Sequence, residues 1–300
     1  MSDAPSPAST EGVDEAFAGI DGWSAARILA GLLDHQAQAI DAVRHALPQL
    51  EAAVEDAAPR LAAGGRLIYV GAGTSGRLGT QDGAELTPTF SWPRERSVFL
   101  MAGGEAAFTR SIEGAEDDAG AGAARMTALS PGPSDVVIAI AASGTTPFAI
   151  AAARAAREGG ALAIGIACNP GAPLFAACDR SVLLATGPEA IAGSTRLKAG
   201  TAQKAALNLL STTLMIRLGR VYRGLMVEMQ ASNEKLRRRA LRMLMRIGDC
   251  SDVVARAALE ATRGDLKCAI LVVLDGLDPT TAAARLAAVG GRVREARAGR

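Results

Sequence analysis

The chain has 300 residues, enough for one large domain or for one domain with smaller additions. Its 32 Lys and Arg residues nearly balance its 31 Asp and Glu residues, and a net charge of +1 gives no indication of binding to nucleic acid or to a membrane surface. The longest apolar runs, DVVIAIAAS and KCAILVVL, are much shorter than the roughly 20 residues that span a bilayer.

Residues 1–12 are rich in Pro, Ser and Ala and show no hydrophobic periodicity, which predicts a disordered tail. This segment also lacks the basic start and apolar core of a secretory signal. The chain has four cysteines and no CxxC pair, so we expect reduced thiols and a cytoplasmic protein. The two histidines, His35 and His45, would face opposite sides of a helix, and we expect no metal site.

Residues 13–56 are predicted to form N-terminal helices, because apolar residues recur at helical spacing from Trp23 to Leu61. This segment is nearly neutral and contains no basic recognition helix. It therefore resembles helices that pack or dimerise more than a DNA-binding domain.

Residues 57–220 are predicted to form an α/β domain with a five-stranded parallel sheet. The strands are expected in five apolar runs: 66–70, 97–101, 135–141, 161–167 and 181–185. Helical segments such as 147–158 separate them, and such alternation predicts flanking helices on both faces of the sheet. Ligands of these sheets bind beyond the carboxyl ends of the strands, so the loops there are the places to search.

Residues 221–300 are predicted to form a small C-terminal helical region. A helix expected at about 225–247 carries several basic residues between Lys235 and Arg246. We interpret this run as a solvated helix face with arginine stems packed on the fold.

Three loops that follow strands combine glycine with Ser or Thr just before a helix. They are GAGTSGR (71–77), ASGTTPF (142–148) and TGPEAIAGSTRLK (186–198). Helix N-termini and hydroxyl groups together favour anions, and the expected phosphate donors are Thr74, Ser75, Ser143, Thr145 and Thr146. The motif GxxxxGK[ST] is missing, and GAGTSG matches GxGxxG without the acidic ribose contact of dinucleotide sites. Three such loops in one sheet favour a phosphorylated small molecule.

Four glutamates lie in or near these loops: Glu85, Glu113, Glu116 and Glu189. Most glutamates are merely solvated. Two carboxylates around an uncharged sugar can nevertheless divide the roles of acid and base.

The segments GAGTSGRLG, DGAELTPTF, SIEGAEDD, SGTTPF and GSTRLKAGTAQKAALNLLST together resemble the N-acetylmuramic acid 6-phosphate etherases, bacterial members of the sugar isomerase (SIS) fold family. The resemblance extends from about residue 61 to residue 246, so residues 57–220 would be an SIS domain. It implies a carbon–oxygen lyase that cleaves the D-lactyl ether of N-acetylmuramic acid 6-phosphate. The products would be N-acetylglucosamine 6-phosphate and D-lactate, within cell-wall sugar recycling. It also implies a homodimer that needs no cofactor.

The resemblance assigns roles to individual residues. It places the catalytic glutamates at Glu85 and Glu116, and we expect Glu85 as the acid and Glu116 as the base. The phosphate site would comprise Thr74, Ser75, Ser143, Gly144, Thr145 and Thr146, with Glu189, Ser194 and Lys198 as weaker candidates for sugar contacts. One departure is STEGVDEAF, where the family usually shows Thr-Glu followed by Arg, Asn and Pro.

Two alternatives remain at this point. A non-catalytic phosphosugar-binding regulator would keep the hydroxyl loops but could lose either glutamate, and both are present. An aldose–ketose isomerase also uses a carboxylate base at carbon 2, and only product analysis separates it, because an isomerase releases no lactate.

Overall fold

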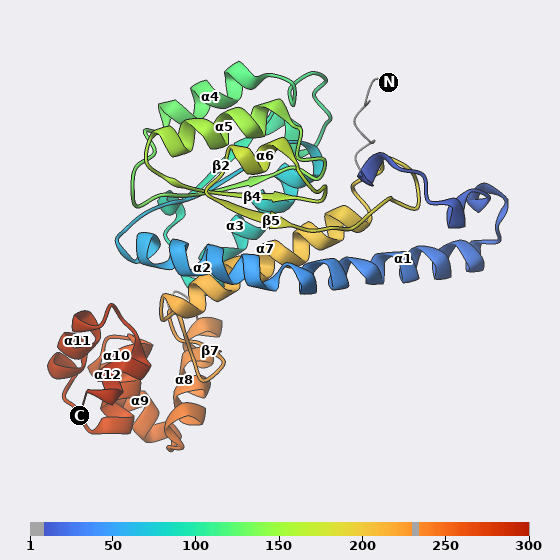
Figure 1. Cartoon of the computed structure of the whole chain (residues 1–300). Coiled ribbons are helices and arrows are strands. Elements are labelled where there is room, and N and C mark those ends of the chain that lie inside the picture. The colour runs from blue at the N-terminus through green and yellow to red at the C-terminus, as the bar shows by residue number, and fades with distance from the viewer. Residues whose placement is uncertain (1–8, 230–233, 300) are drawn as a thin grey trace. The chain divides into compact units, whose positions relative to one another are not determined.

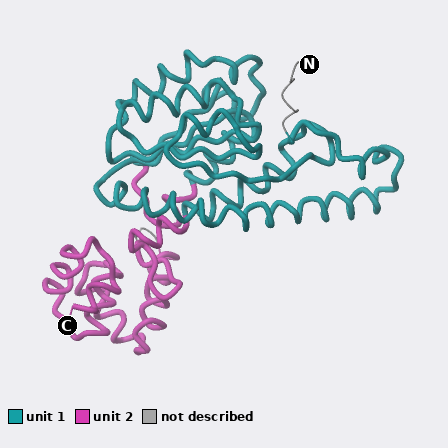
Figure 2. Tube along the Cα trace, in the orientation of Figure 1, with its two compact units in different colours: residues 1–84, 95–211 teal, residues 85–94, 212–300 magenta. Residues whose placement is uncertain are grey.

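The computed structural model describes residues 9–229 and 234–299 of the chain (Figure 1). The chain divides into two compact units, residues 1–84 with 95–211 and residues 85–94 with 212–300 (Figure 2). The first boundary falls inside helix α3, Gly73–Phe90, and the second inside helix α7, Lys198–Arg217. The domain boundary expected at 56/57 lies inside helix α2, Leu47–Ala62.

The first unit contains the predicted parallel sheet of five strands. They are β1 Leu67–Gly71, β2 Ser97–Met101, β3 Val136–Ile140, β4 Leu162–Ala167 and β5 Arg180–Leu183. The spatial order is β2-β1-β3-β4-β5, and every pairing is parallel. The strands β1, β3 and β4 are buried along their whole length, which is why they appear in the sequence as continuous apolar runs. The expected fold class is confirmed.

Helices cover both faces of this sheet (Figure 1). On one face lie α4 Ala119–Ala128, α5 Pro147–Glu158 and α6 Pro173–Ala176. On the other face lie α2 and α3, with α1 Ala25–His45 preceding α2. Glycines let α3 approach the sheet, because a Cβ at Gly79 or Gly83 would meet the ring of Tyr69.

The described residues before α1 pack against the rest of the first unit, which corrects part of the predicted tail. Residues 9–11 form a turn of 3-10 helix, and Thr10 is fully buried. Short 3-10 turns at Glu15–Phe17 and Ile20–Gly22 follow. Residues 1–8 of the expected tail lie outside the described residues.

The second unit is mainly helical and has its own apolar core. A hairpin of β6 Val221–Tyr222 and β7 Leu225–Met226 precedes α8 Glu234–Gly248. The helix expected from about 225 therefore begins only at Glu234 among the described residues, and its basic residues are exposed as predicted. Four helices complete the unit: α9 Asp252–Ala261, α10 Leu266–Asp275, α11 Pro279–Ala288 and α12 Val293–Ala298.

No helix among the described residues has the length and apolar character needed to span a membrane.

Candidate active site

The first predicted loop forms a tight turn between β1 and α3. A Cβ at Gly76 would overlap the Met101 sulfur and would lie 2.8 Å from the Gly71 carbonyl oxygen, so only glycine fits this approach. Thr74 and Ser75 lie in the first turn of α3, where backbone N–H groups lack acceptors within the helix. Thr74 is half-buried and Ser75 is 7% exposed. The geometry of this turn is compatible with the anion site that the sequence predicts, which stays a prediction.

The second loop joins β3 to α5. Gly144 has a φ of +72°, and a Cβ there would overlap Ala172, so a glycine is required. The Ser143 hydroxyl oxygen accepts hydrogen bonds from the Thr145 N–H at 3.2 Å and the Thr145 hydroxyl at 2.9 Å. Thr146 is the residue before α5, so three hydroxyl groups lie at the start of this helix.

Glu116 lies beside the second loop although it belongs to a different segment of the chain. Its backbone carbonyl accepts a hydrogen bond from the Phe148 N–H, in the first turn of α5, at 3.0 Å. The Glu116 side chain is exposed. The structure therefore places the backbone of Glu116, one of the two predicted catalytic residues, next to a predicted phosphate-binding loop.

The third loop differs from the expected anion site, because its helix N-terminus already holds a carboxylate of the chain. Glu189 is fully buried, and its oxygens accept the N–H groups of Lys198 at 2.9 Å and Ala199 at 2.8 Å. This occupies the N-terminus of α7. The geometry favours a positioning role for Glu189 over a sugar contact.

Lys198 and Ser194 are less accessible than a sugar-binding role suggests. Lys198 is 2% exposed, and its ammonium group donates a hydrogen bond to Gln38 Oε1 of α1 at 3.2 Å. Burial lowers the pKa of Lys198, while the nearby carboxylates of Glu189 and Asp14 act in the opposite direction. Ser194 is half-buried in the loop before α7.

Sequence reasoning did not single out two buried amides that contact the hydroxyl loops. Gln203 of α7 is fully buried and accepts a hydrogen bond from the Ser75 hydroxyl at 2.9 Å. Asn169 is 3% exposed, and its Nδ2 donates to the Ser143 carbonyl at 3.1 Å. Asn169 lies two residues after the end of β4, at the sheet edge where the other loops lie. That position is the signal in the sequence that could have identified it.

Glu85 lies far along α3 from the residues of the first loop. From Thr74 to Glu85 are eleven helical positions, which correspond to a rise of about 16 Å. One turn earlier, the buried Asp82 accepts hydrogen bonds from the Tyr69 hydroxyl at 3.0 Å and from Asn208 Nδ2 at 2.8 Å, which holds the helix in place. The Glu85 side chain is exposed.

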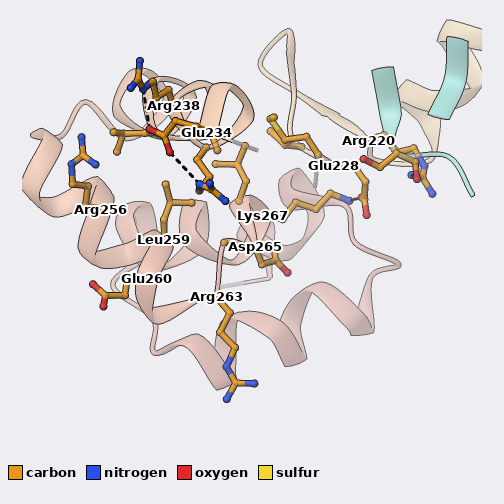
Figure 3. Close-up of a pocket in the computed structure, with 18 of the residues that line it drawn as sticks. Arg220, Glu228, Glu234, Arg238, Arg256, Leu259, Glu260, Arg263, Asp265 and Lys267 are labelled. Carbon is orange, nitrogen blue, oxygen red and sulfur yellow. Dashed lines mark hydrogen bonds and ion pairs between the residues drawn. The ribbon is translucent and has the colours of Figure 1, made fainter. Parts of the chain in front are cut away.

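The second unit contains a separate pocket of about 1210 Å³, with a strongly charged lining (Figure 3). Its ionic groups are largely paired: Glu234 with Arg237 and Arg238, and Glu228 with Lys267. None of the predicted site residues lines this pocket. In the described part of the chain, no three His, Cys, Asp or Glu side chains are arranged to hold a metal ion.

Comparison with known proteins identifies the domains and the relatives of the chain. Residues 49–157 match the glucokinase regulatory protein N-terminal SIS domain, and residues 118–213 match the SIS domain. The N-acetylmuramic acid 6-phosphate etherase of Deinococcus radiodurans is 53% identical over 96% of this chain and 95% of that protein. The protein of the same name from Cutibacterium acnes is 47% identical over 96% of this chain and 95% of its own length.

Solved structures share the fold at lower identity. A Bacteroides fragilis protein, named as a candidate phosphosugar isomerase involved in capsule formation, matches with a TM-score of 0.50 and 21% identity. The match covers 65% of this chain and 91% of that one. At this identity the likeness establishes the fold alone.

Proposed function

The chain belongs to the family of N-acetylmuramic acid 6-phosphate etherases, and on that premise we propose how its own residues cleave this substrate. It is a carbon–oxygen lyase that acts on N-acetylmuramic acid 6-phosphate in cell-wall sugar recycling. The observation that carries the proposed mechanism is the position of Glu116, whose backbone is bonded to the first turn of α5 beside the hydroxyl loop 142–148.

The phosphate of the sugar binds at the N-termini of α3 and α5. Helix α3 begins two residues after the buried strand β1, and α5 follows the buried strand β3 through the loop 142–148. Both helix N-termini present backbone N–H groups to an anion. Thr74 and Ser75 add hydroxyl groups from α3, and the hydroxyls of Ser143, Thr145 and Thr146 lie ahead of α5. The strands β1 and β3 are neighbours at the point where the strand order reverses, the usual binding crevice of such sheets.

The reaction is an elimination followed by hydration. In the opened sugar, carbon 1 is an aldehyde, which makes the proton on carbon 2 acidic. Glu116 removes that proton, the electron pair forms the carbon 2–carbon 3 double bond, and the bond from carbon 3 to the lactyl oxygen breaks. Glu85 supplies the proton that the departing lactate oxygen takes. Water then adds at carbon 3 and a proton returns to carbon 2, which gives N-acetylglucosamine 6-phosphate and D-lactate.

We infer that Glu85 acts on a sugar held by another copy of the chain, and the length of α3 supports this proposal. A phosphate at the start of α3 lies about 16 Å from the position of Glu85 on the same helix. Six bonds of about 1.5 Å each join the phosphorus to the ether oxygen, so the two atoms lie less than about 9 Å apart. To reach Glu85 of the same chain, a sugar bound at the N-terminus of α3 would also have to extend along this helix, which packs on the sheet. A homodimer that brings Glu85 of the partner subunit to the site removes this difficulty.

An apolar row on the N-terminal helices offers a surface for the second copy. Leu33, Ile40 and Leu47 recur every seven positions, and their exposed fractions are 70%, 49% and 47%. Leu29, one turn before Leu33, is also 70% exposed. Several exposed apolar residues along α1 and the start of α2 are typical of an interface.

A cytoplasmic location is also part of the proposal. All four cysteines are free thiols, and three of them are buried. This is the usual state in a reducing compartment.

Oxygen labelling tests the mechanism. The protein is incubated with N-acetylmuramic acid 6-phosphate in heavy-oxygen water, and both products are analysed by mass spectrometry. We expect unlabelled lactate, and label at carbon 3 of the N-acetylglucosamine 6-phosphate. Label in the lactate would instead indicate direct attack on the lactyl carbon. A ketose phosphate without lactate would make the protein an isomerase and overturn the proposal.

A further inference from the structure

The contact between Ser75 and Gln203 leaves a buried donor unused. Ser75 Oγ donates to Gln203 Oε1, and both residues are buried. Gln203 Nε2 has no hydrogen-bond partner among the described residues, although Gln203 is 0% exposed. A buried N–H group without an acceptor is unfavourable, so the arrangement needs an explanation.

The two ends of a carboxamide have nearly the same shape, and a half-turn of the group exchanges them. In the first orientation, the Ser75 proton is directed at Gln203 Oε1 and is not available to a ligand. In the second, Gln203 Nε2 donates to Ser75 Oγ, and the Ser75 proton is free to point elsewhere. Apart from the exchange of Oε1 and Nε2 in Gln203, the heavy atoms of Ser75 and Gln203 need not move between the two orientations.

The location of Ser75 decides which orientation a ligand would favour. Ser75 lies in the first turn of α3, where the helix dipole and free N–H groups attract an anion. A phosphate dianion presents acceptor oxygens and needs donors. Only the second orientation of Gln203 lets Ser75 donate to it, and hydrogen bonds to charged acceptors are the stronger kind.

We propose that Gln203 is a positioning residue for the phosphate of the substrate. When the phosphate binds, Gln203 donates from Nε2 to Ser75 Oγ, and Ser75 donates its own proton to a phosphate oxygen. Gln203 thus acts through Ser75 and does not touch the reacting atoms. The proposal rests on the proposed function only in taking the anion to be the phosphate of the sugar.

A double-mutant cycle on binding tests this. Dissociation constants for inorganic phosphate and for N-acetylglucosamine 6-phosphate are measured by calorimetry for the wild type, Ser75→Ala, Gln203→Met and the double variant. Each single variant should bind both ligands about tenfold more weakly, and the double variant should be no weaker than Ser75→Ala. Near-wild-type phosphate affinity in Gln203→Met, or losses that add in the double variant, would overturn the proposal.

Two controls separate positioning from a general packing role. Gln36→Met breaks a similar amide–hydroxyl pair, between Gln36 Oε1 and the Thr201 hydroxyl, and should leave phosphate affinity unchanged. Binding of unphosphorylated N-acetylglucosamine should not differ between the wild type and Gln203→Met. An equal loss for both sugars would assign Gln203 to packing.

A measurement on the wild type keeps the proposal testable if Gln203→Met does not fold. The side-chain amide signal of Gln203 is followed by nitrogen-15 NMR as inorganic phosphate is added. We expect a shift that saturates with phosphate and is absent with N-acetylglucosamine; an unchanged signal at saturating phosphate contradicts the proposal. These experiments measure binding, so they stand apart from the release of lactate that tests the proposed function.

Discussion

Thr10 and Asn169 share two hydrogen bonds although 159 positions separate them in the sequence. The Thr10 N–H donates to Asn169 Oδ1 at 3.1 Å, and Asn169 Nδ2 donates to the Thr10 hydroxyl at 2.9 Å. Since the same Nδ2 also donates to the Ser143 carbonyl, the N-terminal segment supports the proposed phosphate-binding loop through one side chain.

Asn169→Ala should therefore weaken both the fold and substrate binding. Losing these buried hydrogen bonds should cost about 2 kcal/mol of unfolding free energy. The KM should rise several-fold, because the loop 142–148 loses its support, while kcat changes less. Urea unfolding and steady-state kinetics measure the two effects. Ser9→Ala is the matched control, since it removes only the bond from the Ser9 hydroxyl to Asn169 and leaves the Thr10 and Ser143 bonds intact. A KM equal to that of the wild type in Asn169→Ala would exclude the supporting role.

Mixed oligomers of Glu85→Gln and Glu116→Gln should recover activity that neither variant has alone. If Glu85 serves a sugar held by the other copy, a mixed dimer contains one site with both carboxylates intact. Random mixing makes about half of the dimers mixed, so recovery should approach a quarter of the wild-type rate. Lactate release after joint refolding measures it. Neither variant should release lactate when it is refolded alone. No recovery in a mixture shown to contain mixed dimers would place both glutamates on one chain.

Leu33→Glu should convert the protein into an inactive, folded monomer. A charge in the centre of the exposed apolar row on α1 would have to be buried by the second copy, which is costly. Size-exclusion chromatography with light scattering and circular dichroism measure assembly and folding. Val253→Glu is the control, because Val253 is 75% exposed on α9, outside this row. An active monomer would contradict the proposal that the site needs a partner.

Much of the fold follows from local sequence patterns. The buried strand β3 is a run of β-branched and alanine residues, so its pattern identifies it without tertiary information. Helix α5 begins at Pro147, where proline favours a helix start. The loops after β1 and β3 are also recognisable from local sequence, because in each a glycine and hydroxyl residues stand at or just before the start of a helix.

The rest depends on contacts between distant parts of the chain. Thr10 lies in a stretch with no periodicity, and its hydrogen bonds to the distant Asn169 could not be predicted from that stretch. Glu189 carries no local sign that it caps α7 nine positions later. The separation of Glu85 from the first loop becomes clear only once α3 is seen to continue as one helix to Phe90.

The pair of Arg66 and Asp135 should stabilise the fold in a pH-dependent way without affecting catalysis. These residues precede β1 and β3, at the sheet edge opposite the site. Arg66 donates to both Asp135 oxygens, at 3.1 Å and 2.6 Å, and the Gly132 N–H donates at 3.0 Å. Burial acts to raise the pKa of Asp135, but these hydrogen bonds outweigh it and hold the pKa below its ordinary value.

A carboxyl whose pKa is lower in the folded state stabilises the fold above its unfolded pKa of about 3.9 and loses that contribution as the pH falls through the folded value. Asp135→Asn should therefore be less stable than the wild type by about 1 to 3 kcal/mol at pH 7, and the difference should shrink below pH 4 or so. Urea unfolding at pH 7 and near pH 3 measures this, and kcat/KM at pH 7 should stay close to that of the wild type. Asp179→Asn is the control. Asp179 pairs with Arg157 at 3.0 Å, but both side chains are half-exposed, so this variant should lose less stability than Asp135→Asn. An equal stability difference at both pH values for Asp135→Asn would show that the carboxylate charge does not contribute.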